Sequence, residues 1–238
     1  MKDVGAIWLT CGLSPVLEQS YRHARALFGE RLLVVENGVS MDFSVRMEDQ
    51  TIIRIADPDP SYSRAMNRAA DWWSTHNPTP EFLVFLQDDF IFIDNILLLI
   101  ERLRSDPAAG AIGCALVDHA SRMHSCILKS QRDGSVVGVP TKEPRPIVPP
   151  EYVTPIVVRR RAFESVGGFD GGFSPAYYED VDLCFKLVHA GWKVLADPGV
   201  RIGHVTGSTT SGLYTAVQMA QIRKRNVARL VEKWPDLY

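Results

Sequence analysis

Short apolar runs alternate along the chain with segments whose apolar positions recur every three or four residues. The apolar runs predict buried β-strands at 4–10, 32–35, 51–56, 82–86 and 111–117. Polar caps predict that helices begin at Ser14, at Ser61 or Ser63, and at Asp94. Strands and helices that alternate in units of this size favour right-handed crossovers. The predicted fold class is therefore α/β, with a mainly parallel central sheet flanked by helices.

The second half of the chain is more polar and carries more proline. Residues 118–150 read as a long excursion with a hairpin. The pattern then predicts strands at 152–158 and 193–196, and helices at 160–166, 179–190 and 213–233. A length of 238 residues fits one large α/β domain, which we divide at about residue 117 into a first half (1–117) and a second half (118–238).

Composition excludes several classes of protein. Lys and Arg number 26 and Asp and Glu 28, and a net charge of −2 gives no overall positive field to attract nucleic acid or an acidic membrane. The apolar stretch 82–100 is interrupted by Asp and Asn, which excludes a transmembrane helix there. Four cysteines without a C-x-x-C pair suggest a reducing compartment, so we expect a cytoplasmic location.

Acidic and amide side chains follow two predicted strands where each strand ends. Glu36 and Asn37 come after one strand, and Asp88 and Asp89 after another. Carboxyl ends of parallel strands meet at one edge of a sheet, where ligands gather. A cation would relieve the repulsion between adjacent carboxylates, and oxygen ligands suit Mg²⁺ or Mn²⁺. The alternative is that Asp88 and Asp89 only begin a surface turn.

Two further positions complete a candidate constellation. Glu179 and Asp180 begin a predicted helix, where the helix dipole favours negative charge and would keep a general base ionised. Stabilisation of that helix is the simpler alternative. His204 follows a strand and offers a nitrogen ligand to a metal held by the acidic pair, although a lone histidine is more often structural.

At this point the order of the motifs resembles that of family 2 glycosyltransferases with the GT-A fold. The resemblance extends from about Val4 to His204 and excludes 118–150 and the C-terminal helix. The segments that carry it are Glu36–Ser40, Ser63–Asn67, Phe85–Asp89, Gly167–Asp170, Tyr178–Leu183 and Gly203–His204.

The resemblance implies an inverting transferase that uses a nucleotide-diphosphate sugar and a divalent metal, Mn²⁺ or Mg²⁺. Asp180 matches the general base. Asp89, with Asp88 and His204, matches the metal site, and Asp88 can also contact ribose. Glu36 stands where the family usually has an Asp that touches the base or ribose.

The remaining expectations concern the two substrates. Asn37, Arg64 and Asn67 would reach the nucleotide, so residues 1–117 form the nucleotide-sugar-binding half. Tyr178 and Glu179 would contact the acceptor, in an acceptor-binding half at 118–238. A segment at 207–212 would close over the site to exclude water.

The identities of both substrates stay open. The donor is UDP-, dTDP- or GDP-linked, and the acceptor is a saccharide, lipid-linked glycan, protein or modified nucleic acid. Trp72 and Trp73 are adjacent on one predicted helix and cannot both face one core stripe, which leaves one of them exposed or at an interface. A homodimer is a further hypothesis.

Two functions other than glycosyl transfer fit parts of this pattern. A sugar-phosphate nucleotidyltransferase shares the α/β plan, but needs a glycine-rich, basic loop after the first strand, and 9–15 is not such a loop. A non-catalytic nucleotide-sugar-binding protein would not need the metal pair, the base and the histidine together.

Overall fold

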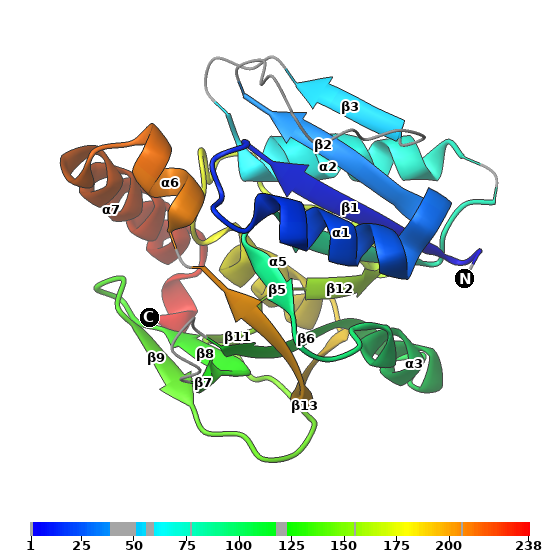
Figure 1. Ribbon diagram of the computed structural model, residues 1–238. Coiled ribbons are helices and arrows are strands. Elements are labelled where there is room, and N and C mark those ends of the chain that lie inside the picture. Colours follow the sequence, from blue (N-terminus) through cyan, green and yellow to red (C-terminus); the bar gives the residue numbers. More distant parts are fainter. Residues whose placement is uncertain are drawn as a thin grey trace.

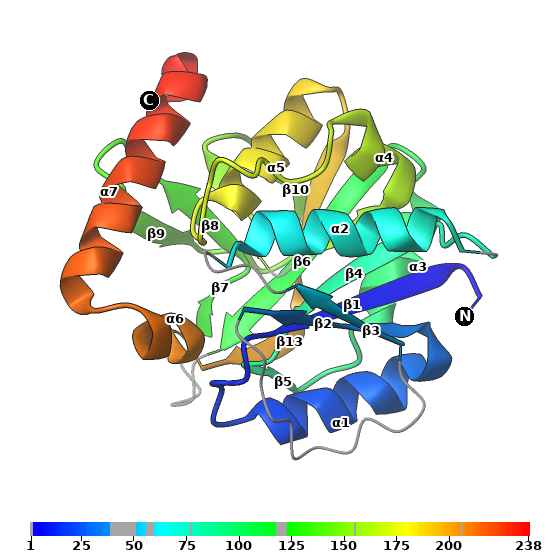
Figure 2. The same ribbon diagram turned by 90° about the horizontal axis from the view of Figure 1, so that it is seen from above.

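The computed structural model describes residues 2–38, 51–55, 60–76, 78–117, 123–154, 156–205 and 207–238. Within these ranges a large twisted sheet of ten strands runs through the molecule, with helices on both faces (Figures 1 and 2). The helices are α1 (Leu17–Phe28), α2 (Tyr62–Ser74), α3 (Leu97–Ser105), α4 (Arg160–Ser165), α5 (Glu179–His189), α6 (Ser208–Leu213) and α7 (Ala216–Lys233).

Five central strands follow the predicted apolar runs closely. They are β1 (Val4–Thr10), β2 (Leu32–Asn37), β3 (Thr51–Ile55), β4 (Phe82–Gln87) and β6 (Ala109–Val117). The other two differ from their predictions: β12 (Ile156–Arg159) covers only part of the predicted 152–158, and β13 (Lys193–His204) extends well past the predicted 193–196. The order of all these strands with the short β10 (Arg145–Pro146) is β10-β13-β6-β12-β4-β1-β2-β3. β1 pairs in parallel with β2 and β4, β2 with β3, and β6 with β13. β12 runs antiparallel between β4 and β6, so the sheet is mainly parallel as predicted.

Alternate residues of each strand contribute to two cores, one on each face. On one face Trp8, Val34 and Val84 pack with residues of α1 and α3. On the other Ile7 and Val35 pack with residues of α2, α4 and α5. Strands that are buried on both faces explain the near-continuous apolar runs in the sequence.

Two predicted helix starts are wrong and one is confirmed. Ser61 caps α2 by accepting from the Arg64 amide (3.4 Å). α1 instead begins after Val16, without a side-chain cap from Ser14. Asp94 does not cap α3, because its Oδ2 accepts from the backbone amide (3.0 Å) and Nε (2.7 Å) of Arg201 on β13.

The second half contains the expected hairpin. β8 (Ile127–Ser130) and β9 (Val136–Val139) form it, and β11 (Glu151–Tyr152) adds a third strand on the β8 side. Two short strands join the large sheet at its edges, β5 (Phe90–Phe92) on β13 and β7 (Met123–Ser125) on β6. The first part of the excursion, 118–122, lies outside the described residues.

The C-terminal helix predicted at 213–233 is confirmed as α7, and a separate short helix, α6, precedes it. α6 ends at Leu213, and α7 begins after Thr215, whose side chain forms a capping box with Gln218. The second half of α7, which contains the buried Leu230, packs against the rest of the protein. No described helix has the length and apolar character required to span a bilayer.

α7 is fastened to α5 by one buried carboxylate. Asp182 is fully buried and accepts from Nε1 of Trp234 (2.9 Å) and from Nζ of Lys233 (3.0 Å). On α2, Trp73 belongs to the core, while the half-buried Trp72 stacks on His76 with ring centroids 3.3 Å apart. The predicted packing difference between the two tryptophans is thus confirmed.

Candidate active site

The carboxyl ends of β1, β2 and β4 open into a small pocket of about 80 Å³. Its lining combines both halves of the chain: the strand ends, the start of α2, the loop before α5, and α6. The described residues that line it are Leu9, Thr10, Cys11, Asn37, Pro60, Tyr62, Gln87, Asp88, Pro175, Ala176, Thr210, Leu213 and Tyr214. The strand-end position expected for a ligand is therefore hollow.

Asp88 is held at the end of β4 by the neighbouring strand. Its amide donates to the carbonyl of Leu9 (3.1 Å), and its Oδ2 accepts from the hydroxyl of Thr10 (2.6 Å). Asp88 and Asp89 are both buried. The two adjacent carboxylates thus lie in a buried turn between β4 and β5 rather than in a solvated one.

Asp89, directly before β5, contacts His204 at the end of β13. Its Oδ2 lies 3.2 Å from Nε2 of His204, and its carbonyl accepts from the amide of Val205 (3.0 Å). The contact arises because β5 pairs antiparallel with β13, which sets Phe90 opposite His204. Two candidate metal ligands from distant parts of the chain are therefore together.

The third candidate ligand, Asp88, does not join them in a preformed cluster. In the part of the chain that the structure describes, no three His, Cys, Asp or Glu side chains are grouped to hold a metal ion. The carboxylate oxygen of Asp89 suits Mn²⁺ or Mg²⁺, and the imidazole nitrogen of His204 favours Mn²⁺, a transition metal, over Mg²⁺.

Asp180 lies in the first turn of α5, with Glu179 before it. Its Oδ1 accepts from the Val181 amide (2.8 Å), and the Thr154 side chain also bonds to it. Burial raises the pKa of Asp180 to about 6 despite these bonds. Burial and then the charge of Asp180 hold the pKa of Glu179 well above its ordinary value.

From the sequence, the helix dipole was expected to keep a general base ionised. Burial instead raises the pKa of both carboxyl groups, because desolvation outweighs the dipole, although a pKa of about 6 still leaves Asp180 ionised. Asp180 is mainly ionised at neutral pH, while the environment favours the protonated form of Glu179. One acid and one base therefore lie side by side.

Tyr62 experiences the charges of both acidic segments, Glu179–Asp180 and Asp89. It was not singled out from the sequence. Burial raises the pKa of its phenol, and the charges of Glu179, Asp180 and Asp89 raise it further. Tyr62 itself lines the pocket, so the charges of all three carboxylates act on a phenol at the pocket wall. No sequence signal marks Tyr62, because its position follows only from α2 lying against the loop before α5, where its amide donates to Pro175 (2.8 Å).

The nucleotide contacts expected from the sequence divide into two groups. Asn37 is buried, lines the pocket, and its Oδ1 has no hydrogen-bond partner among the described residues. Glu36 is instead paired with Nε of Arg54 (2.7 Å). Arg64 is exposed on the first turn of α2 and lies outside the described side chains that line the pocket.

Asn67 has a different use from the one expected. Its Nδ2 donates to the carbonyl of Phe169 (2.8 Å), and its Oδ1 accepts from the Phe169 amide (2.9 Å). Both amide atoms are thus engaged by one backbone segment. Asn67 joins α2 to the Gly168–Phe169 turn, and a nucleotide contact would require breaking that pair of bonds.

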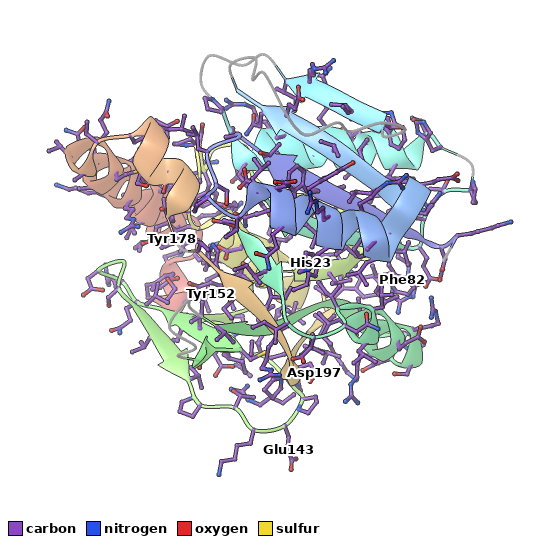
Figure 3. The ribbon with its side chains drawn as sticks, in the orientation of Figure 1. His23, Phe82, Glu143, Tyr152, Tyr178 and Asp197 are labelled. Carbon is purple, nitrogen blue, oxygen red and sulfur yellow. The ribbon has the colours of Figure 1, made fainter. Side chains whose placement is uncertain are left out.

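The expected acceptor residues are only partly accessible. Tyr178 is buried, and its hydroxyl donates to the carbonyl of Gly134 (2.9 Å), so its ring is not an open stacking surface. Figure 3 shows it between α6 and the β8–β9 hairpin. Tyr177 is more exposed, its hydroxyl lies 3.1 Å from the Thr210 hydroxyl, and Arg223 lies over its ring.

The segment at 207–212, expected to be a closing loop, is mostly helical. α6 occupies 208–213, and Thr210 and Leu213 already line the pocket. The segment therefore forms one wall of the site.

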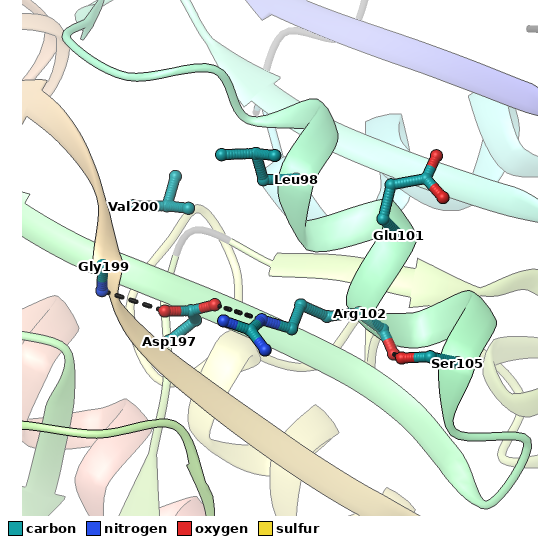
Figure 4. A pocket seen from close by; sticks show the side chains of 7 residues that line it. All are labelled: Leu98, Glu101, Arg102, Ser105, Asp197, Gly199 and Val200. Carbon is teal, nitrogen blue, oxygen red and sulfur yellow. Dashed lines mark hydrogen bonds and ion pairs between the residues drawn. The ribbon is translucent and has the colours of Figure 1, made fainter.

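A larger hollow of about 360 Å³ lies elsewhere, between α3 and β13 (Figure 4). Its one buried carboxylate, Asp197, accepts from Nε of Arg102 (2.9 Å) and from the Gly199 amide (2.9 Å). Both carboxylate oxygens are thus used within the fold. This hollow lacks the strand-end position and the free acceptor seen at Asn37, so it is not the candidate active site.

Comparisons with known proteins agree with the described architecture. No protein-family model and no curated protein sequence matches the chain. A crystal structure of GalNAc-T7 with UDP, GalNAc and Mn²⁺ is similar, with a TM-score of 0.63 and 13% sequence identity. The match covers 85% of this chain and 43% of that chain, so this chain spans less than half the length of that protein. At such identity the likeness shows the fold alone, and the chain has the GT-A fold that its motifs predicted.

Proposed function

We propose that this protein is a metal-dependent inverting glycosyltransferase of the family 2 type. It would transfer a sugar from a nucleotide-diphosphate sugar to an acceptor hydroxyl. The observation that carries the proposal is the contact of Asp89 with His204 beside a strand-end pocket; the charges of Asp89 and Asp180 both raise the pKa of Tyr62 in the wall of that pocket. The likeness to GalNAc-T7 with UDP, GalNAc and Mn²⁺ supports a UDP-sugar and Mn²⁺ as the first ligands to test.

Asp89 and His204 are the residues proposed to hold the metal. Their oxygen and nitrogen fit a divalent cation, and the buried Asp88 adds negative charge beside them. The diphosphate of the donor would supply further oxygen ligands. A cation bound there would offset the charge that develops on the departing diphosphate.

The pocket at the strand ends would receive the nucleotide. Asn37 offers Oδ1, a buried acceptor without a described partner, to an N–H or O–H donor of the base or ribose. Asp88, already bonded to Thr10, would contact ribose or the metal. α6 forms one wall of this pocket. That wall would keep water away from the anomeric carbon of the donor sugar.

Asp180 is the proposed general base. It would take the proton of the acceptor hydroxyl while that oxygen attacks the anomeric carbon from the face opposite the diphosphate. The new C–O bond forms as the bond to the diphosphate oxygen breaks, so the configuration inverts. A pKa near 6 leaves Asp180 ionised at neutral pH yet more basic than an exposed carboxylate.

The test measures release of nucleoside diphosphate from a panel of UDP-, dTDP- and GDP-sugars with Mn²⁺. Slow hydrolysis by water reports donor activation even before the acceptor is known. A set of saccharide acceptors follows, and NMR of the product reads its anomeric configuration. We expect metal-dependent release and an inverted product, whereas a retained configuration would rule out the single displacement proposed here.

A further inference from the structure

The backbone just before α5 is in an unfavourable conformation. Tyr177 and Tyr178 have φ values of 78° and 76°, in the left-handed region. Residues with a Cβ are disfavoured there, and two in succession are rarer still. Such a conformation persists only where surrounding contacts enforce it, and it gathers at functional sites.

One fully buried side chain of α7 binds the backbone of this segment directly. Nδ2 of Asn226 donates to the carbonyl of Ala176 (2.9 Å) and to that of Tyr177 (3.2 Å). The neighbouring Arg225 donates to the carbonyl of Ser174. α7 therefore binds the carbonyl groups of this segment from one side.

The same segment sets the start of α5. The carbonyl of Tyr178, the second left-handed residue, accepts from the Asp182 amide (2.9 Å), a bond of the first turn. No side chain caps α5 at this end. The direction of the first turn, and with it the place of Asp180, depends on the backbone at 176–178.

We propose that Asn226 is a positioning residue for Asp180. Its amide holds the left-handed turn that aims the first turn of α5 at the site. The C-terminal helix, which the motif resemblance does not include, is then part of the machinery that presents the base. This inference rests on the proposed function only in taking Asp180 as that base.

The first test compares two variants of α7. Asn226→Leu keeps the size of the side chain and removes its donors. Arg229→Met is the control, because Arg229 ties the same helix to Asp170 (2.9 Å). We expect Asn226→Leu to lower kcat about 10- to 100-fold with the donor KM within about twofold, and Arg229→Met to change kcat less than about twofold. Equal losses in the two variants would mean that Asn226 only anchors the helix, and would overturn the proposal.

A double-mutant cycle tests the backbone argument. Glycine adopts positive φ without steric cost. In Tyr177→Gly the left-handed turn therefore needs less stabilisation from the hydrogen bonds of Asn226. We expect Asn226→Leu to reduce kcat less than about threefold in the Tyr177→Gly background. The same loss in both backgrounds would contradict a role in holding the turn.

A substrate-free measurement separates this inference from the proposed function. NMR titration of the Asp180 carboxyl carbon follows its pKa directly. In Asn226→Leu we expect the pKa to move toward the ordinary value by about one unit, because water reaches a loosened first turn. An unchanged titration would overturn the positioning role. If the wild-type protein transfers no sugar, the proposed function fails, and this titration still decides the inference. Asn226→Ser replaces Asn226→Leu in every arm if the leucine variant does not fold.

Discussion

The carboxylate of Asp89 lies 3.2 Å from Nε2 of His204, although the two residues are 115 positions apart. Both are fixed by backbone pairing, since β5 and β13 are hydrogen-bonded neighbours at this point. A carboxylate and an imidazole held so closely by two strands need little rearrangement to share a cation. This relationship leads to the first prediction.

Asp89→Ala should abolish metal-dependent nucleotide binding. We expect wild-type protein to gain thermal stability from UDP only with Mn²⁺ or Mg²⁺ present, because the ion links the carboxylate to the diphosphate. The variant should show no such shift. Asp71→Ala, at an exposed position of α2, is the control and should behave as wild type. A full shift in Asp89→Ala would remove Asp89 from the metal site.

Asp180→Asn should separate binding from transfer. The amide keeps the shape of the side chain but cannot accept the acceptor proton. We expect the donor to bind with unchanged affinity and kcat to fall by at least about 100-fold. Isothermal titration and product release measure the two quantities. Substantial turnover in this variant would exclude Asp180 as the base.

The rate should follow the ionisation of Asp180. Burial raises its pKa to about 6, so the base is lost as pH falls through that value. We expect kcat/KM to be level near neutral pH and to fall about tenfold per unit below pH 6. Donor hydrolysis measured between pH 4.5 and 8 checks this. A profile that stays level down to pH 4.5 would show an unperturbed carboxylate or a different base.

The burial of Asp180 should also lower the free energy of unfolding at neutral pH. A folded-state pKa above the ordinary value of 3.8 means that the folded protein binds the proton more tightly than the unfolded chain. The stabilising contribution is present at acidic pH and is lost as pH rises from about 4 to about 6. Asp180→Asn should therefore raise the free energy of unfolding at pH 7.5 by about 1–3 kcal/mol and change it little at pH 4. Urea unfolding at the two pH values measures this, and an equal effect at both would contradict the assignment.

Asp182→Ala should detach α7. Removing this fully buried carboxylate leaves Nε1 of Trp234 without its acceptor and removes the buried charge that Lys233 faces. Breaking a buried pair of this kind costs about 3–5 kcal/mol. We expect a large loss of stability and faster amide exchange along the second half of α7. The exposed Asp236→Ala serves as the control. Unchanged exchange in α7 would show that other contacts hold the helix.

Much of the fold follows from patterns within a few residues. The strands β1, β2, β4 and β6 are apolar runs because both of their faces are covered, and the positions just after them follow at once. Placing Asn37 and Asp88 at one edge needed only the rule for parallel strands. Ser61 at the start of α2 is an equally local signal.

Other features depend on contacts between distant segments. From its neighbours in sequence, Asp94 is expected to cap α3. In the structure its carboxylate instead accepts a hydrogen bond from Arg201 on β13. Asn67 binds the backbone of Phe169 for the same reason, because the turn after α4 lies against α2. Local spacing carries no information on such partners.

The sequence by itself determined the alternation of strands and helices, the α/β class and the acidic strand end, because each of these is set by periodicity and neighbouring residues. The GT-A fold was implied only by the resemblance of the motif order to a known family. Tertiary structure alone decided that Nε2 of His204 lies 3.2 Å from Asp89, that the charges of three carboxylates raise the pKa of Tyr62, and that Asn226 binds the turn before α5. Tertiary structure also decided the protonation states of Glu179 and Asp180. A helix dipole can be inferred from position along the chain, but desolvation depends on everything packed around the carboxyl groups, and here desolvation is the larger effect.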